Sequence, residues 1–251
     1  MKGSVVQSTD LGQLNKTTIE EYLHSPPVGW APQLVFTSPP FAPGPDYGVQ
    51  LEDWFSGLAC EIVPGGSLVV VLGNCWRDGR QTRETLEALM DITRFSGMQL
   101  VQQFVTYFAE PQLSASVRDE MYPRMLSKGD RVPDIHGHAW WLAHPGQEPK
   151  VNRRALQRSV VPAALSTEDH RWRDACWRND LKPPHSAMPE SLPDYFIQLL
   201  TDEGDMVLDP FAGSNATGVA AERSGREWLS IEPDDDALAV AKLRLEGSLD
   251  E

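Results

Sequence analysis

Residues 206–218 read Met-Val-Leu-Asp-Pro-Phe-Ala-Gly-Ser-Asn-Ala-Thr-Gly, and the rest of the chain is most easily placed around this stretch. Its first three residues form a short apolar run that is typical of a buried parallel strand, and Pro210 prevents a central strand from continuing. Gly213 opens a turn in which small residues let the backbone approach a ligand closely. Asn215 tolerates a positive φ, and Ser214 is expected to cap the following helix. The stretch therefore predicts a strand, a tight turn and the start of a helix.

A second strand is expected at residues 227–231, and it ends on Glu232. Glu232 follows Gly213 at the roughly 20-residue distance at which a Rossmann-like unit places an acid on a ribose diol. No lysine lies near this stretch, so the pattern of a phosphate-binding loop is absent. Asp209 at the strand end and Glu232 on the ribose favour a cationic or zwitterionic nucleoside. S-adenosylmethionine fits that description better than a nucleoside di- or triphosphate.

Composition places the chain among globular proteins with one main domain and an insertion. Its 251 residues and 41% hydrophobic content suffice for one substantial core. No apolar run approaches the length of a membrane span and the first residues do not form a secretory signal, so a cytoplasmic protein is expected. Three scattered cysteines exclude a disulfide framework. The histidines His136, His138 and His144 have no acid or cysteine at ligand spacing, so no metal is expected.

The charges are unevenly distributed along the chain. A net charge of −14 argues against a surface devoted as a whole to nucleic acid, because phosphate binding requires local positive charge. Residues 150–182 nevertheless carry eight basic and four acidic residues. Such a segment on an acidic body is typical of a polyanion contact, although a solvated charged loop has the same composition. The candidate phosphate contacts are Arg153, Arg154, Arg158, Arg171 and Arg173.

Hydrophobic patterns along the chain predict alternating strands and helices. Strands are expected at residues 3–8, 33–36, 67–72, 98–108, 139–143, 206–208 and 227–231, and helices at 17–24, 51–62, 82–95, 191–200, 219–222 and 234–245. The strands at 98–108 and 139–143 lack a helical crossover, which predicts an antiparallel hairpin at the sheet edge. Residues 145–184 show no clear period and suit an excursion that faces a substrate. Within them, Trp172 and Trp177 are expected to pack rather than to wedge between bases.

A second motif, residues 37–41, follows the strand at 33–36 and reads Thr-Ser-Pro-Pro-Phe. Its two prolines fix φ and remove two N–H donors, so the turn is rigid and presents carbonyl acceptors without competing donors. Such a turn accepts both hydrogens of an exocyclic amine. Ser38 adds a hydroxyl, and Phe41 offers a face on which a nucleobase stacks. The turn follows the carboxyl end of a strand, where open α/β sheets build their sites.

Together the two motifs resemble those of the amino DNA methyltransferases. Residues 37–41 are similar to the catalytic motif of that family in its N4-cytosine form, and residues 209–218 are similar to its S-adenosylmethionine motif. The catalytic motif comes first, which is the order of the permuted beta class. Residues 185–193 are similar to a His-x-Ala-x-Pro segment that helps hold the methionine part of the cofactor. Asp10 follows Thr9 where the family has Gly-Asp, with the acid reaching the cofactor adenine.

This resemblance implies an α/β, Rossmann-like methyltransferase fold with a mostly parallel seven-stranded sheet, an antiparallel edge hairpin and a circularly permuted motif order. Residues 1–144 would form the catalytic half, 145–184 a short basic insertion for target recognition, and 185–251 the cofactor-binding half. The catalytic residues would be Ser38, Pro39, Pro40 and Phe41. The residues around S-adenosylmethionine would be Asp10, Thr37, His185, Ser186, Asp209, Pro210, Phe211, Gly213, Ser214, Asn215, Thr217 and Glu232.

The predicted reaction is in-line transfer of the sulfonium methyl to N4 of a cytosine flipped out of duplex DNA, in a restriction-modification setting. Hydrogen bonds from N4 to Ser38 and to the Pro39 carbonyl would aim the nitrogen lone pair at the methyl group. The same turn would accept the N6 amine of adenine, although Ser38 favours cytosine because adenine enzymes of this family more often have Asp or Asn there. RNA methylation and an inactive, cofactor-binding partner subunit are the remaining alternatives.

Overall fold

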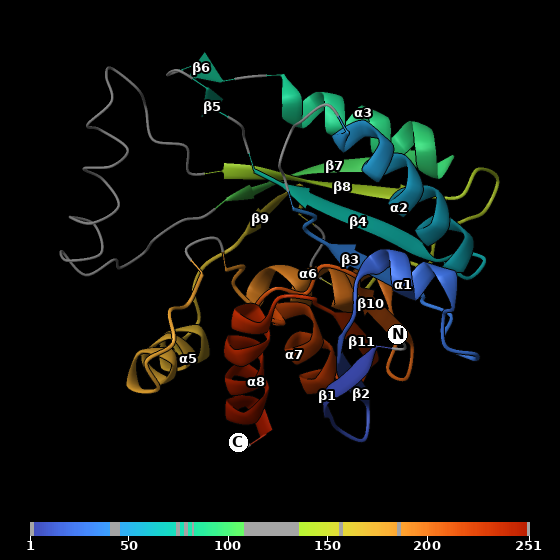
Figure 1. Ribbon diagram of the computed structural model, residues 1–251. Coiled ribbons are helices and arrows are strands. Elements are labelled where there is room, and N and C mark those ends of the chain that lie inside the picture. Colours follow the sequence, from blue (N-terminus) through green and yellow to red (C-terminus); the bar gives the residue numbers. More distant parts are fainter. Residues whose placement is uncertain are drawn as a thin grey trace.

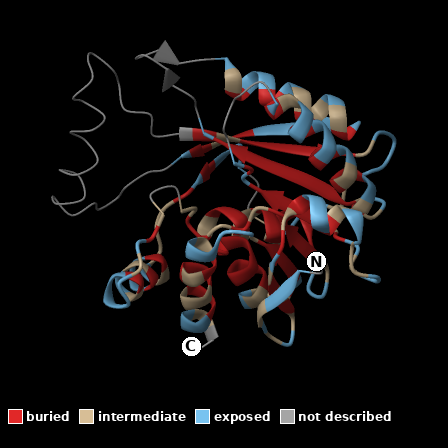
Figure 2. Cartoon of the chain, viewed as in Figure 1, coloured by how far each residue is buried: buried red, intermediate tan, exposed pale blue. Residues whose placement is uncertain are grey.

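The computed structural model describes residues 3–40, 46–73, 76–77, 80–81, 83–107, 136–155, 158–184 and 187–249. Figure 1 shows a central sheet with helices on both of its sides. Buried residues line the sheet and the helix surfaces that face it, whereas the outer helix surfaces are exposed (Figure 2). The chain therefore has the layered arrangement of an α/β protein.

Nine strands of the described chain form the central sheet, in the order β1-β2-β11-β10-β3-β4-β8-β7-β9. In that order their bounds are Ser4–Ser8, Gly12–Lys16, Glu227–Ile231, Met206–Asp209, Leu34–Thr37, Ser67–Leu72, His136–Ala143, Gln99–Tyr107 and Val160–Pro162. Strands β2, β11, β10, β3 and β4 are parallel, and β8 runs antiparallel to both β4 and β7. A separate ribbon pairs β5 (Trp76–Arg77) with β6 (Arg80–Gln81).

The central strands are buried throughout because helices cover both faces of the sheet. Every residue of β3, β4 and β10 is buried, as expected of parallel strands between two helical layers. Successive residues of β3 face opposite cores, with Leu34 and Phe36 in one hydrophobic cluster and Val35 in the other. This two-sided burial fixes the register of β3 and with it the position of Ser38, which follows directly.

All described helices except α5 fall into two groups, one on each face of the sheet (Figure 1). The helix bounds are α1 (Ile19–His24), α2 (Tyr47–Glu61), α3 (Glu84–Ser96), α5 (Thr167–Arg178), α6 (Ser191–Leu200), α7 (Ala216–Arg223) and α8 (Asp235–Leu249). Helices α1, α2 and α3 share one core cluster with the sheet, and α6, α7 and α8 share the other. Helix α5 packs against α8 through Trp172 and Val240. Within the described segments, no helix combines the length and the apolar character needed to cross a membrane.

The predicted Rossmann-like, mostly parallel sheet is confirmed. The seven strands from β2 to β7 in the sheet order form the expected core, and β1 and β9 extend its two edges. The hairpin predicted from residues 98–108 and 139–143 is present as β7 and β8, but β9 pairs with the outer side of β7. The hairpin therefore does not form the outermost edge along its whole length.

Strand β2 is the element that the sequence did not reveal near the amino terminus. Only Gly12 and Leu14 among its five residues are buried, so its apolar signal is weak. Gly12 is required by close packing, because a Cβ added there would lie 2.5 Å from the ring of Trp228. Residues 3–8, which the sequence predicts as a strand, form β1 on the outer side of β2. The catalytic half thus begins with a hairpin rather than with a single strand.

Helix α5 lies within residues 145–184, where no period was apparent. Ser166 accepts a hydrogen bond from the backbone N–H of Asp169, whose carboxylate accepts one in return, and this capping box starts the helix. The buried residues Asp169, Trp172 and Cys176 recur at helical spacing. Because the first of them is an acid, a purely hydrophobic pattern does not detect this face.

Candidate active site

The two motifs meet at one edge of the sheet because β3 and β10 are neighbouring parallel strands. Thr37 ends β3 and Asp209 ends β10. The hydroxyl Oγ1 of Thr37 donates to Oδ1 of Asp209 at 3.1 Å. Since the carboxyl ends of parallel strands share an edge, both following turns start side by side. The adjacency that methyl transfer between the motifs requires is therefore present at the strand ends.

Asp209 ties this edge together through three accepted hydrogen bonds. Besides Thr37, its donors are the backbone N–H of Phe211 at 3.1 Å and Oγ1 of Thr217 at 2.6 Å. The side chain is buried, and this burial raises the pKa of Asp209 to about 6, with Glu232 contributing in the same direction and the three hydrogen bonds opposing. One buried carboxyl group thus connects β3, the turn after β10 and the first turn of α7.

The raised pKa of Asp209 predicts a pH dependence of stability. The folded-state pKa of about 6 exceeds the ordinary pKa of 3.8. The protonated carboxyl group therefore stabilises the folded state fully below pH 3.8, and this stabilisation is lost as the pH rises through 6. Between pH 4 and pH 8, wild type should lose up to about 3 kcal/mol of unfolding free energy relative to Asp209→Asn. Urea unfolding at a series of pH values measures this difference. The control is Asp53→Asn, which changes an exposed residue of α2. If the difference in unfolding free energy between wild type and Asp209→Asn did not change with pH, the site would not hold the carboxyl group as described.

Gly213 and Glu232 shape the turn between them. Gly213 has a φ of 52° and its backbone N–H donates to Oε2 of Glu232 at 2.8 Å. Oε1 of Glu232 accepts from the backbone N–H of Asp234 at 2.9 Å. Burial raises the pKa of Glu232, against the effect of these two hydrogen bonds. A carboxylate has about four acceptor positions, so Glu232 retains capacity for hydroxyl donors. Among the described residues, and apart from its two chain neighbours, no heavy atom lies within 4 Å of a Cβ placed on Gly213, so this side of the turn is open.

The start of α7 differs from the prediction. Asn215 occupies the N-cap position in the left-handed conformation, with a φ of 60°, and makes no side-chain cap bond. Its Oδ1 instead accepts from Oγ of Ser230 on β11 at 2.6 Å. Ser214 does not cap the helix either, because its Oγ accepts from Nη1 of Arg244 at 2.8 Å. Gly218 is needed beneath this loop, since an added Cβ would collide with Oδ1 of Asn215.

The proline corner after β3 has one buried and two exposed members. Pro39 is buried, whereas Ser38 and Pro40 are exposed at the sheet edge. The carbonyl of Pro40 accepts a hydrogen bond from the hydroxyl of Tyr47 at 3.0 Å, which fixes the corner to the start of α2. Phe41, like the predicted cofactor residues His185 and Ser186, lies outside the described residues.

Asp10 is not brought to this edge, which corrects its assignment to the cofactor adenine. It precedes β2, and β2 runs parallel to β11, so Asp10 lies at the amino end of β11 while Glu232 lies at the carboxyl end. Its neighbour Thr9 donates to Glu222 near the end of α7 at 2.6 Å. The residue of β2 beside Glu232 is Asn15, whose carbonyl accepts a hydrogen bond from the backbone N–H of Glu232 at 3.1 Å. The undetected strand β2 accounts for the error.

Arg153 and Arg154 also lie away from the two motifs. The chain just before them is fixed to the amino edge of the sheet, where the backbone N–H of Lys150 donates to the Gly65 carbonyl at 2.9 Å. Asn152 donates in the same way to the carbonyl of Leu199 at the end of α6. The sequence analysis groups these arginines with those at residues 158–173 as one contact for a polyanion. In the fold they follow a segment that lies at the amino edge of the sheet, opposite the edge that carries the two motifs.

The other three candidate phosphate contacts have different surroundings. The backbone N–H of Arg158 donates to the hydroxyl of Tyr195 at 2.9 Å, well before α5 in the chain. Arg173 is half-buried with its guanidinium carbon 5.7 Å from the ring centroid of Trp172. Arg171 is exposed on α5. Helix α5 lies on the side of the molecule to which the carboxyl ends of β4 and β7 point (Figure 1).

The two tryptophans of α5 behave differently. Trp172 packs as predicted, with its Nε1 donating to the Val240 carbonyl at 2.9 Å. Trp177 does not pack in the core, because its side chain is 59% exposed. The predicted packing role is therefore correct for Trp172 and wrong for Trp177.

Three charged residues that the sequence did not single out are buried beside the turn after β10. They are Asp169 on α5, Glu190 before α6 and Arg244 on α8. The only sequence signal was the Ser-x-x-Asp spacing of the capping box at Ser166, because Arg244 lies in an ordinary amphipathic segment.

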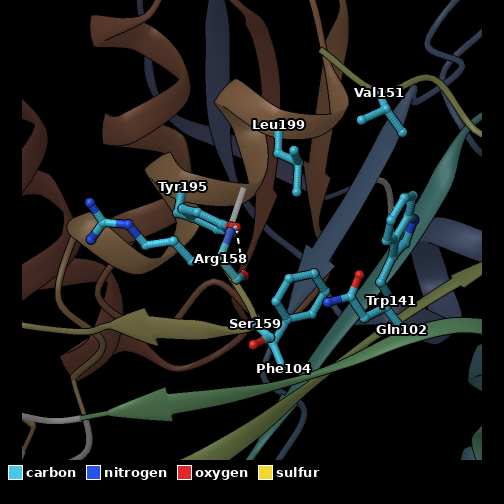
Figure 3. A pocket seen from close by; sticks show the side chains of 8 residues that line it. All are labelled: Gln102, Phe104, Trp141, Val151, Arg158, Ser159, Tyr195 and Leu199. Atoms are coloured by element: carbon cyan, nitrogen blue, oxygen red, sulfur yellow. Dashed lines mark hydrogen bonds between the residues drawn. The ribbon is translucent and has the colours of Figure 1, made fainter. Parts of the chain in front are cut away.

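A hollow of about 300 Å³ lies elsewhere, beside α6 and the β7–β8 hairpin (Figure 3). It is lined by Gln102, Phe104, Trp141, Val151, Arg158, Ser159, Tyr195 and Leu199. In Figure 3 the rings of Phe104 and Trp141 border the space, whereas the guanidinium of Arg158 points away from it. None of these lining residues belongs to either motif, so this hollow is separate from the motif edge.

Comparison with known proteins gives consistent matches over most of the chain. A family model described as DNA methylase matches residues 33–243. The type II methyltransferase M.PvuII of Proteus hauseri is 26% identical, with 84% of this chain and 77% of that protein covered. The type II methyltransferase M.BamHI of Bacillus amyloliquefaciens is also 26% identical, covering 89% of this chain and 55% of that protein.

Solved structures share the fold. The PvuII DNA methyltransferase (cytosine-N4-specific) superimposes with a TM-score of 0.78 at 24% identity, covering 98% of this chain and 94% of the other. The protein TTHA0409 of Thermus thermophilus, in complex with S-adenosyl-L-methionine, gives a TM-score of 0.66 at 21% identity, with 94% and 93% covered.

Proposed function

The chain belongs to the N6/N4 family of DNA methylases, and we propose that it transfers a methyl group from S-adenosylmethionine to the N4 amine of cytosine in DNA. The observation that carries this proposal is the Thr37–Asp209 hydrogen bond, which fixes the proline corner next to the turn of Gly213. Ser38 in that corner favours cytosine over adenine. The likeness to a cytosine-N4-specific enzyme supports the same choice.

The residues of the turn fit the proposed cofactor. Glu232 would accept the ribose hydroxyls, and Gly213 leaves room for the backbone to approach the ligand. The carbonyl of Asn15 accepts from the backbone N–H of Glu232. Oδ1 of the same residue is buried without a hydrogen-bond partner among the described residues, and a donor group of the ligand would satisfy it. Asp209 and Glu232 supply negative charge that suits a sulfonium. When bound, S-adenosylmethionine supplies an electrophilic methyl group on that sulfur.

The proline corner would orient the accepting amine. Its nitrogen is a poor nucleophile because the lone pair is delocalised into the ring. Ser38 is exposed at the sheet edge, where its hydroxyl would accept one amine hydrogen, and the carbonyl of Pro39 would accept the other. These bonds favour a more tetrahedral nitrogen and aim its lone pair, so positioning supplies much of the rate. The proton would leave after methyl transfer, since none of the described residues of the corner is a strong base.

A cytosine in duplex DNA would have to leave the base stack to reach this corner. Flipping costs a few kcal/mol of lost stacking and pairing. In this proposal Phe41 offsets part of that cost by stacking on the flipped base, as its place in the motif suggests.

DNA phosphates would contact α5 rather than the turn of Arg153 and Arg154. Arg171→Ala should weaken binding of duplex DNA and lower the slope of log K against log salt by about one, the value for one lost phosphate contact. Fluorescence anisotropy with a labelled duplex at several salt concentrations measures the slope. The double variant Arg153→Ala/Arg154→Ala is the matched control and should leave the slope unchanged. If the double variant lowered the slope and Arg171→Ala left it unchanged, DNA would instead contact the amino edge of the sheet, near Arg153 and Arg154.

A transfer assay tests the proposed substrate class. Wild type is incubated with tritiated S-adenosylmethionine and, in separate reactions, with duplex DNA, single-stranded DNA and RNA. We expect label in DNA and none in RNA. Label in RNA alone would replace DNA by RNA as the substrate. Cofactor binding without transfer to any of the three would indicate the inactive partner subunit instead.

A further inference from the structure

Arg244 is a buried hub beside the turn after β10. Its side chain is 1% exposed although it lies on the surface helix α8. Nη1 donates to Oγ of Ser214 at 2.8 Å, and Nη2 donates to the carbonyl of Met188 at 3.2 Å. Ser214 belongs to the turn after β10, and Met188 belongs to the segment before α6. One guanidinium group therefore connects two segments that the sequence assigns to the cofactor.

Two buried acids balance the charge of Arg244. Its Nε donates to Oε1 of Glu190 at 3.1 Å, and its Nη2 donates to Oδ1 of Asp169. Nη1 of Arg223 donates to the other oxygen of Glu190 at 2.6 Å. Burial raises the pKa of Glu190, against the opposing effect of Arg244 and Arg223. The Arg244 guanidinium carbon also lies 4.4 Å from the ring centroid of Trp172. Charge-assisted hydrogen bonds in several directions hold Arg244 in one orientation.

Asp169 links α5 to this network. Its Oδ2 accepts from the backbone N–H and the hydroxyl of Ser166 at 2.9 and 3.0 Å, while Oδ1 faces Arg244. The indole of Trp172 fixes the same helix to α8 through the Val240 carbonyl. The inner face of α5 is therefore devoted to Arg244 and α8, and only its outer face is left for other contacts.

We propose that Arg244 is a positioning residue for cofactor binding, which fixes Ser214 against the Met188 carbonyl, and that the inner face of α5 serves to hold Arg244. This inference rests on the proposed placement of S-adenosylmethionine at the turn of Gly213. Arginine suits the task because its planar fork donates in several directions at once, whereas a lysine ammonium is a compact point charge. A helix from the basic insertion thereby contributes to the cofactor site.

Arg244→Lys tests the proposal without leaving the buried acids unpaired. We expect the Kd and the KM for S-adenosylmethionine to rise about tenfold while kcat at saturating cofactor stays within about twofold, the signature of lost binding that is uniform along the reaction. Calorimetric titration with S-adenosylmethionine gives the Kd, and steady-state kinetics give the other two constants. Asp169→Asn should raise the Kd in the same direction, because it removes the charge that orients Arg244.

Arg226 provides a matched control at the other edge of the sheet. It is buried and donates to the hydroxyl and carbonyl of Thr201 and to the carbonyl of Ser224. Arg226→Lys should lower the Tm as Arg244→Lys does but leave the Kd for S-adenosylmethionine unchanged. Equal effects of the two variants on Kd, or no effect of Arg244→Lys, would overturn the positioning role. If wild type itself does not bind S-adenosylmethionine, the proposed function fails rather than this inference.

A double-mutant cycle separates positioning from general loosening. Ser214→Ala removes the group that Arg244 is proposed to fix, so it should also raise the Kd. In the double variant with Arg244→Lys, the loss of binding free energy should be smaller than the sum of the losses in the two single variants, because both changes remove one shared interaction. Fully additive effects would mean that Arg244 does not act through Ser214.

Discussion

Replacing Ser38 with alanine should lower kcat about 100-fold, as expected when a preorganised hydrogen-bonding group at a reacting centre is removed. The Kd for S-adenosylmethionine should stay within about twofold, because Ser38 lies on the turn after β3 and not on the turn of Gly213. The reason is that the serine hydroxyl would orient the accepting amine, which matters for transfer but not for holding the cofactor. Single-turnover methyl transfer with saturating cofactor and DNA measures the chemical step, and calorimetry measures the Kd.

Ser56→Ala is the control for this prediction. Ser56 is an exposed serine on α2, and its hydroxyl donates to the carbonyl of Glu52 within the same helix. The control should leave both constants unchanged. Equal losses of kcat and cofactor affinity in Ser38→Ala would contradict the assigned role, since they would indicate that the serine shapes the whole site.

Asp209→Ala should lower the affinity for S-adenosylmethionine by at least about 100-fold. The change leaves the hydroxyls of Thr37 and Thr217 and the backbone N–H of Phe211 without their common acceptor. Each unpaired buried group costs about 1–3 kcal/mol. The turn of Gly213 would rearrange to satisfy these donors, and it would lose the shape that fits the ligand. Calorimetric titration measures the affinity, and circular dichroism establishes that the variant is folded.

Asp205→Ala is the matched change just before the amino end of β10. The Asp205 carboxylate accepts from the ammonium of Lys150 and from the backbone N–H of Asp202, so it too stabilises a turn. This variant should bind S-adenosylmethionine with nearly unchanged affinity. A comparable loss in both variants would mean that the affinity reports overall stability and not the arrangement around Asp209.

The central part of the fold was predictable because its signals are local. Strands β3, β4 and β10 each contain a short apolar run, and a glycine or proline follows within two residues of the strand end. The order of the two motifs then predicts turns on one edge of a parallel sheet. The pairing of β3 with β10 could not be read from local pattern, because the two strands lie far apart in the chain.

The sequence did not place residues correctly in space where long-range packing decides their position. The sequence of β2 is mostly polar, and its burial depends on the tryptophan of β11, so Asp10 was placed at the wrong edge. Arg153 and Arg154 are close in sequence to α5, but backbone hydrogen bonds fix the preceding residues to the amino edge. Arg244 gave no signal because its partners Asp169, Glu190 and Ser214 come from three other elements.

The identity of the methylated nucleoside tests the central claim most directly. Duplex DNA treated with the enzyme and S-adenosylmethionine is digested to nucleosides and analysed by mass spectrometry. A proline corner that presents Ser38 to a cytosine amine predicts N4-methylcytosine in wild type and its near absence with Ser38→Ala. Methylation on carbon 5 of cytosine, or N6-methyladenine as the product, would contradict the proposed cytosine amine as the acceptor.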